Sequence, residues 1–192
     1  MIKIGLLLID GFALMSYSSV VEPLRAANLL SEKKLYSISN LSSRNISTSS
    51  SGTKVDTIVI GNEKEKLDII FVCAGGDPFL YNNSKVFDWL RKKSREGSSL
   101  GGVSGGPVII AKAGLMRGKR MTLHWEHSDA FKETWPSISL EKSLFVIDQN
   151  RISCAGGIAP LDLSLIHISG AHETPEHRGF RGGGVKKNGG GG

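Results

Sequence analysis

The stretch Leu100-Gly101-Gly102-Val103-Ser104-Gly105-Gly106-Pro107-Val108 decides the fold of this 192-residue chain. Its first four residues are typical of a short strand, and Val108–Leu115 has the apolar spacing of a helix. Small residues between them permit a sharp turn that projects the Ser104 side chain over the edge of a sheet. A helix beginning at Gly105 would aim backbone N–H groups at the same place. The stretch therefore predicts a strand–turn–helix unit with a candidate site at its turn.

Outward from this unit, strand-like and helix-like segments alternate along the chain. Strands are expected at Ile2–Ile9, Leu35–Leu41, Leu67–Cys73, Leu100–Val103 and Arg120–Leu123, with a loop or ragged hairpin over 42–54 and a hairpin of Leu144–Ile147 and Arg151–Ser153. Helices are expected at Ser18–Leu30, Val86–Lys93 and Val108–Leu115, between His127 and about Glu133, and over Gly157–Ile166. This alternation predicts an α/β fold with a largely parallel central sheet, whose ligand sites lie at the carboxyl ends of the strands.

The composition is that of an ordinary globular domain, with 40% hydrophobic and 22% charged residues. Apolar runs such as Ile4–Ile9 are shorter than the roughly 18 residues of a transmembrane helix, and the N-terminus lacks a signal-peptide layout. We therefore expect a cytoplasmic protein without membrane contact. Cys73 and Cys154 are far apart, so we expect reduced thiols and neither a metal site nor a cofactor. The net charge of +6 forms no concentrated stripe and is little evidence for nucleic-acid contact.

The C-terminal stretch 169–192 has no apolar period of 3.6 or 2 and ends in four glycines. Such a segment cannot bury a face, and we predict that it is disordered. Leu165–Thr174 resembles a translated adapter, which indicates that the reading frame was lost near Ser164; a genuine flexible tail is the alternative. We expect one domain over residues 1–168 and a non-native tail over 169–192.

Glycines and a carboxylate are expected beside the turn at Ser104. Gly75 and Gly76 directly follow a buried strand, where they let the backbone approach a ligand and offer N–H groups to an anionic oxygen. Glu22 lies in an apolar helix segment, where a buried carboxylate needs a partner and a solvent-facing one does not. The expectation places Gly75, Gly76 and Glu22 at one sheet edge, with a solvent-facing Glu22 as the alternative.

A histidine and a tryptophan follow the next strand. His124 lies 20 residues beyond Ser104, which is enough for one helix and one strand to bring it back beside the turn. Trp125 is either a core residue or one wall of a pocket, where its ring face would hold a cation. The N–H groups favour a carboxylate, and the ring and Glu22 favour a cation, so together they indicate a zwitterionic ligand.

Four segments carry a family resemblance: Glu22–Asn28, Gly102–Pro107, Ala113–His127 and Ala155–Leu163. They resemble the N-terminal domain of AraC-family transcription regulators of the glutamine-amidotransferase-like subgroup, which belongs to the PfpI-like superfamily. The residues of Gly102–Pro107 and His124–His127 most resemble those of regulators of carnitine and related quaternary-ammonium catabolism. The resemblance implies a flavodoxin-like three-layer sandwich, PfpI-like and class I glutamine amidotransferase-like.

The resemblance also implies functional positions. Enzymes of the superfamily carry a cysteine at the elbow, a glutamate from the first helix and a histidine after the next strand; these places map to Ser104, Glu22 and His124. The chain departs from the pattern in having serine at 104. A helix N-terminus lowers the pKa of a thiol, whereas a serine needs an adjacent general base, for which His124 with Glu126 is the candidate. We therefore expect a ligand pocket rather than a catalytic one.

Three functions stay open at this point. The favoured one is a sensor that binds a small-molecule effector, with Glu22, Gly75, Gly76, Ser104, Gly105, His124 and Trp125 as ligand-binding residues. The alternative is a PfpI-like hydrolase or amidase with Ser104 as nucleophile, and the third is a dimerisation module with an empty pocket. The resemblance implies a homodimer and a helix-turn-helix domain that contacts DNA. We expect that domain to be absent here, so that DNA binding belongs to a longer protein.

Overall fold

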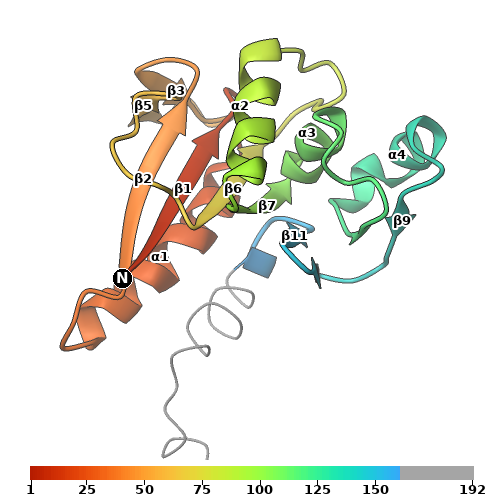
Figure 1. Ribbon diagram of the computed structural model, residues 1–192. Helices are drawn as coiled ribbons and strands as arrows, with labels where there is room; N and C mark the ends of the chain where they lie inside the picture. The colour runs from red at the N-terminus through yellow and green to blue at the C-terminus, as the bar shows by residue number, and fades with distance from the viewer. Residues whose placement is uncertain (161–192) are drawn as a thin grey trace, which may run out of the picture.

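The structure is a computed structural model that describes residues 1–160 (Figure 1). The longer elements are β1 (Ile2–Leu8), α1 (Leu14–Leu30), β2 (Tyr36–Ser42), β6 (Ile69–Ala74), α2 (Ser84–Arg95), β7 (Ser99–Ser104), α3 (Gly106–Lys112) and α4 (Ser128–Thr134). The shorter ones are β3 (Ile46–Thr48), β4 (Lys54–Asp56), β5 (Ile58–Val59), β8 (Arg120–Met121), the 3₁₀ turn η1 (Trp125–His127), β9 (Ser139–Leu140), β10 (Phe145–Asp148) and β11 (Arg151–Cys154).

A seven-stranded sheet forms the centre of the molecule, in the order β10-β11-β7-β6-β1-β2-β5. Every neighbouring pair is parallel except β10 and β11, which form an antiparallel hairpin at one edge. The prediction of an α/β fold with a largely parallel sheet is thereby confirmed. Because β6 and β7 are adjacent and parallel, their carboxyl ends, Ala74 and Ser104, lie side by side.

Helices cover both faces of this sheet, which makes three layers (Figure 1). Side chains alternate along a strand, so Leu6 and Leu8 of β1 face α1 whereas Leu7 faces the opposite layer. One core contains Val20 and Leu24 of α1, and the other contains apolar side chains of α2, α3 and α4. Within residues 1–160, no helix is both long and apolar enough to cross a bilayer.

The structure differs from the sequence-based expectation at the first helix and at the strand expected over Arg120–Leu123. The first helix begins at Leu14 rather than Ser18, so Pro23 lies in its interior and not in its first turn. The stretch 42–54 contains one strand and the start of another of the β3–β4 hairpin, which confirms the ragged hairpin. The expected strand Arg120–Leu123 is reduced to β8, which pairs with β9 outside the central sheet. Most of the expected helix Gly157–Ile166, and the predicted tail 169–192, lie outside the described residues.

Candidate functional site

The turn after β7 is a strained elbow. Ser104 has a φ of +59°, in the left-handed region that non-glycine residues seldom adopt. Two glycines make the turn possible. A Cβ on Gly102 would lie 2.7 Å from the Cα of Pro107, and one on Gly106 would lie 2.9 Å from the carbonyl carbon of Val72. The predicted strand–turn–helix geometry around Ser104 is therefore confirmed.

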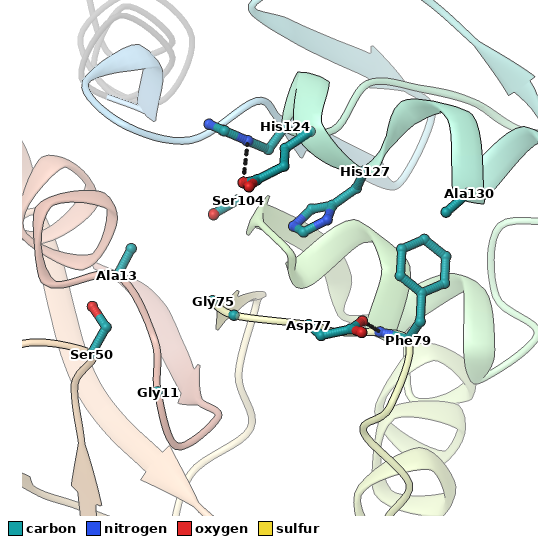
Figure 2. A pocket seen from close by; sticks show the side chains of 12 residues that line it. Gly11, Ala13, Ser50, Gly75, Asp77, Phe79, Ser104, His124, His127 and Ala130 are labelled. Atoms are coloured by element: carbon teal, nitrogen blue, oxygen red, sulfur yellow. Dashed lines mark hydrogen bonds and ion pairs between the residues drawn. The ribbon is translucent and has the colours of Figure 1, made fainter.

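A pocket of about 600 Å³ opens at this elbow (Figure 2). Its wall comes from the turn after β1, the β3–β4 hairpin, the carboxyl ends of β6 and β7, η1 and α4, and consists of Gly11, Ala13, Ser50, Gly75, Gly76, Asp77, Phe79, Ser104, His124, Glu126, His127 and Ala130. Figure 2 shows His124 and His127 near Ser104, with Asp77 and Phe79 on another side. Four predicted site residues, Gly75, Gly76, Ser104 and His124, are thus brought together at one cavity.

Two imidazoles and a carboxylate form the side of the pocket that η1 contributes. His124 Nδ1 lies 3.6 Å from Glu126 Oε2, and the rings of His124 and His127 have centroids 6.0 Å apart. The backbone N–H of His127 donates to the carbonyl of His124 at 3.0 Å, which holds the turn tight. Burial lowers the pKa of His127, with His124 acting in the same direction and Glu126 and Asp77 opposing it. The lowered pKa favours the neutral form of the His127 imidazole.

Glycines form another part of the wall. A Cβ on Gly75 would lie 3.2 Å from the N of Ala13 and closer still to the carbonyl oxygen of Gly11, so only glycine fits between the two turns. Among the described residues, no hydrogen bond uses the N–H of Gly75 or Gly76. Gly105 differs, because its N–H donates to the carbonyl of Ala74 at 3.1 Å. The expectation that Gly105 offers a free N–H to a ligand is therefore wrong, whereas Gly75 and Gly76 retain theirs.

Glu22 lies outside the pocket. Its side chain is 57% exposed and accepts a hydrogen bond at 2.7 Å from Nε of Arg25. The polar residue that α1 buries is Ser16, which is 2% exposed. The two are six positions apart, or about 240° around a helix of 3.6 residues per turn, so they face different sides. The solvent-facing alternative holds for Glu22, and its expected place beside Ser104 is corrected.

Trp125 also lies outside the pocket. It is 79% exposed and lines a separate hollow of about 700 Å³ with, among others, Leu144 and Ala155. The reason is the 3₁₀ turn: His124, Glu126 and His127 point to one side of η1, whereas Trp125 points to the other. The expectation that its ring faces a ligand beside Ser104 is therefore wrong. The aromatic ring in the pocket wall is Phe79, which stacks on Trp135 with ring centroids 6.1 Å apart.

Sequence reasoning missed several lining residues, namely Gly11, Ala13, Ser50, Asp77, Phe79, Glu126 as a wall residue, His127 and Ala130. Asp77 had a usable signal, because it follows two glycines at the end of a buried strand. Ser50 had none. Its N–H donates to the carbonyl of Phe12 at 2.9 Å, a pairing between segments that no local pattern reveals.

Both cysteines at this edge, Cys73 and Cys154, are buried and do not line the pocket. Cys73, one residue before the end of β6, is 1% exposed, and burial raises its pKa to about 12. It is therefore a protonated core residue rather than a nucleophile. Within residues 1–160, Ser104 Oγ takes part in no hydrogen bond. Within the same residues, no three His, Cys, Asp or Glu side chains are grouped so that they could hold a metal ion.

A mostly parallel sheet with helices on both faces and a strained elbow at its carboxyl edge define an α/β protein whose site lies at the ends of its strands. The DJ-1/PfpI family, described by a sequence model that matches residues 2–168, is the family to which the chain belongs. Its fold is confirmed as the flavodoxin-like sandwich by a solved structure, an AraC family transcriptional regulator from Pseudomonas putida. The TM-score is 0.80 at 22% identity, covering 90% of this chain and 93% of that one.

Two sequence relatives are HTH-type transcriptional regulators. GlxA of Rhizobium meliloti (strain 1021) is 44% identical over 163 residues, which cover 84% of this chain and 50% of GlxA. CdhR of Pseudomonas aeruginosa is 42% identical over 167 residues, which cover 86% of this chain and 49% of CdhR. The chain thus spans about half the length of the curated relatives it matches, and the resemblance to AraC-family regulators is confirmed.

Proposed function

We propose that this chain is the effector-sensing domain of a transcription regulator and that a small metabolite binds at Ser104. The observation that carries the proposal is the pocket itself: a metabolite-sized cavity at the sheet edge, built around an elbow that holds serine and no reactive thiol. The regulatory half of the proposal is supported by GlxA and CdhR, which are named as HTH-type regulators and are about twice as long as the matched segment.

The rest of the regulator follows from the same proposal. DNA is contacted by a domain that follows residue 168 in the longer protein, and the sensing domain works as a cytoplasmic homodimer. Effector binding shifts the population of two domain arrangements, and that shift alters DNA binding. The domain itself spans residues 1–168, in line with the family match over residues 2–168.

The wall of the pocket favours a zwitterion. It carries the carboxylates of Asp77 and Glu126 and, among its described lining residues, no lysine or arginine. Phe79 adds a ring face, which attracts a quaternary ammonium group by about 0.5–1 kcal/mol. The N–H groups of Gly75 and Gly76 are suited to a carboxylate. An amino acid or a trimethylammonium carboxylate such as carnitine or a betaine satisfies all of these groups.

Thermal shift and calorimetry on the full chain test this proposal with carnitine, glycine betaine, choline and amino acids. A true effector at 100 times its dissociation constant should stabilise the chain by about 2.7 kcal/mol. Asp77→Asn should weaken a zwitterion at least about tenfold, equivalent to 1.4 kcal/mol. Trp125→Leu is the matched control, because its ring lies in another hollow, and it should bind as the parent does. Failure of every zwitterion to bind would refute the ligand class.

The alternative, a PfpI-like hydrolase with Ser104 as nucleophile, draws support from the strained elbow, which enzymes use to expose a nucleophile. Within the described residues Ser104 has no hydrogen bond to a base, although the contact of His124 Nδ1 with Glu126 leaves His124 Nε2 free for that role. A serine-directed covalent probe separates the two functions. Stoichiometric labelling of Ser104 would favour the hydrolase, whereas an unlabelled chain that binds a zwitterion would favour the sensor.

A further inference from the structure

The turn that follows β11 packs directly on the elbow. Gly156 has a φ of +96°, and a Cβ added there would lie 2.9 Å from the Cβ of Ser104 and 3.0 Å from its Cα. Strand pairing brings the two together, because Cys154, at the end of β11, is the partner of Val103. The backbone of Gly156 therefore lies against the strained serine, and a side chain at position 156 would clash with it.

The same turn is tied to the first helix. The N–H of Gly157 donates to Oγ of Ser16 at 3.0 Å, across 141 positions of sequence. Ser16 is 2% exposed and does not line the pocket. The Ser16 hydroxyl thus joins α1 to the turn in which Gly156 packs against Ser104.

This turn directly follows β11 along the chain. β11 is the last strand in the described residues, and the family match continues only to residue 168. In relatives about twice as long, whatever follows must be reached through the counterpart of this segment. The pocket and the segment that leads onward from β11 therefore meet at Ser104, Gly156 and Gly157.

We propose that Ser16 is a positioning residue that holds the Gly156–Gly157 turn against Ser104 and so links the pocket to the segment that follows β11. With the hydrogen bond in place, the turn supports the left-handed backbone of Ser104. Without it, the turn moves away and the elbow relaxes. A ligand that contacts Ser104 favours one of these arrangements, and this regulatory consequence rests on the proposed sensor function.

Hydrogen exchange on the ligand-free full chain tests the positioning role without any effector. In Ser16→Ala, amides of 101–106 and 155–160 should exchange about tenfold faster, while those of β2 stay unchanged. Ser19→Ala is the control, because the Ser19 hydroxyl donates to the carbonyl of Met15 within the same helix. Ser16→Thr keeps a hydroxyl and should restore slow exchange if Ser16→Ala folds poorly. Faster exchange confined to Gly157, or spread evenly over the chain, would overturn the proposal.

The link to the pocket is tested by titrating glycine betaine into the parent and Ser16→Ala by calorimetry. We expect affinity to fall about fivefold or more in Ser16→Ala, although Ser16 does not line the pocket. Equal affinity in both would overturn the link. If glycine betaine fails to bind the parent, the proposed ligand class is at fault, and the exchange experiment still decides the positioning role.

Discussion

Replacing Gly106 by alanine tests how closely α3 approaches the central sheet. Alanine is favoured over glycine in a helix by about 1 kcal/mol, so an unobstructed site would gain stability. Here the added Cβ would lie 2.9 Å from the carbonyl carbon of Val72 and closer to its oxygen, against an ordinary separation of about 3.5–4.0 Å. Val72 lies in β6, which is hydrogen-bonded on both sides, so the strand cannot yield easily.

Overpacking of this kind costs about 1–3 kcal/mol, and a backbone obstacle puts Gly106→Ala at a net loss of about 2–3 kcal/mol. For a chain of this size the midpoint of thermal unfolding should fall by about 5–10 °C. Urea unfolding followed by circular dichroism measures the loss. Ser84→Ala, at the exposed first residue of α2, is the control and should stay within about 0.5 kcal/mol. A Gly106→Ala chain as stable as the parent would refute the close approach.

Three other measurements address single side chains. Glu63→Gln should lose about 1.5–3 kcal/mol in urea unfolding, because the carboxylate accepts from Lys93 Nζ at 2.8 Å and Trp89 Nε1 at 3.0 Å. Burial alone raises the Glu63 pKa, but the hydrogen bonds that the carboxylate accepts, first of all from Lys93, lower it further than burial raises it. The Glu63 carboxylate therefore stabilises the fold fully above its ordinary pKa of 4.5, and this contribution is lost as pH falls through the lower folded pKa. Burial lowers the pKa of His127, so its contribution to the free energy of unfolding is fully present above the ordinary pKa of 6.5 and falls as pH drops through the folded pKa. His127→Gln should reduce the dependence of the thermal unfolding midpoint on pH in this range. Ser104→Ala should keep its unfolding free energy within about 0.5 kcal/mol in urea, and a larger loss would mean that the hydroxyl is structural.

Local patterns predicted the frame of the site well. The elbow at Ser104 depends on glycines two positions away on either side, so a short stretch of sequence contains its cause. The buried strand β6 is likewise a continuous apolar run, which places Gly75 and Gly76 at the sheet edge. Because parallel strands end at one edge, Gly75, Gly76 and Ser104 are expected together, and the pocket brings them together. His124 also reaches the pocket, although the strand before it, β8, lies outside the central sheet.

The orientation of side chains was beyond these patterns. Whether Glu22 faces the core depends on how α1 is rotated about its axis, and the packing of Val20 and Leu24 against the sheet sets that rotation. Trp125 and His124 are adjacent in sequence, yet a 3₁₀ turn sends them into different hollows. Ser50 reaches the pocket through a backbone pairing to Phe12, which only the folded chain reveals.

The two edge strands of the central sheet bear on how the protein behaves at high concentration. One border is β5, only two residues long, and the other is β10, four residues long. A border strand offers unpaired N–H and C=O groups to any extended chain nearby, and long flat borders seed ordered aggregates. Borders this short offer few such groups to a stray strand. The described sheet should therefore resist edge-to-edge pairing between molecules at high concentration. Aggregation during storage should instead start from partly unfolded chains.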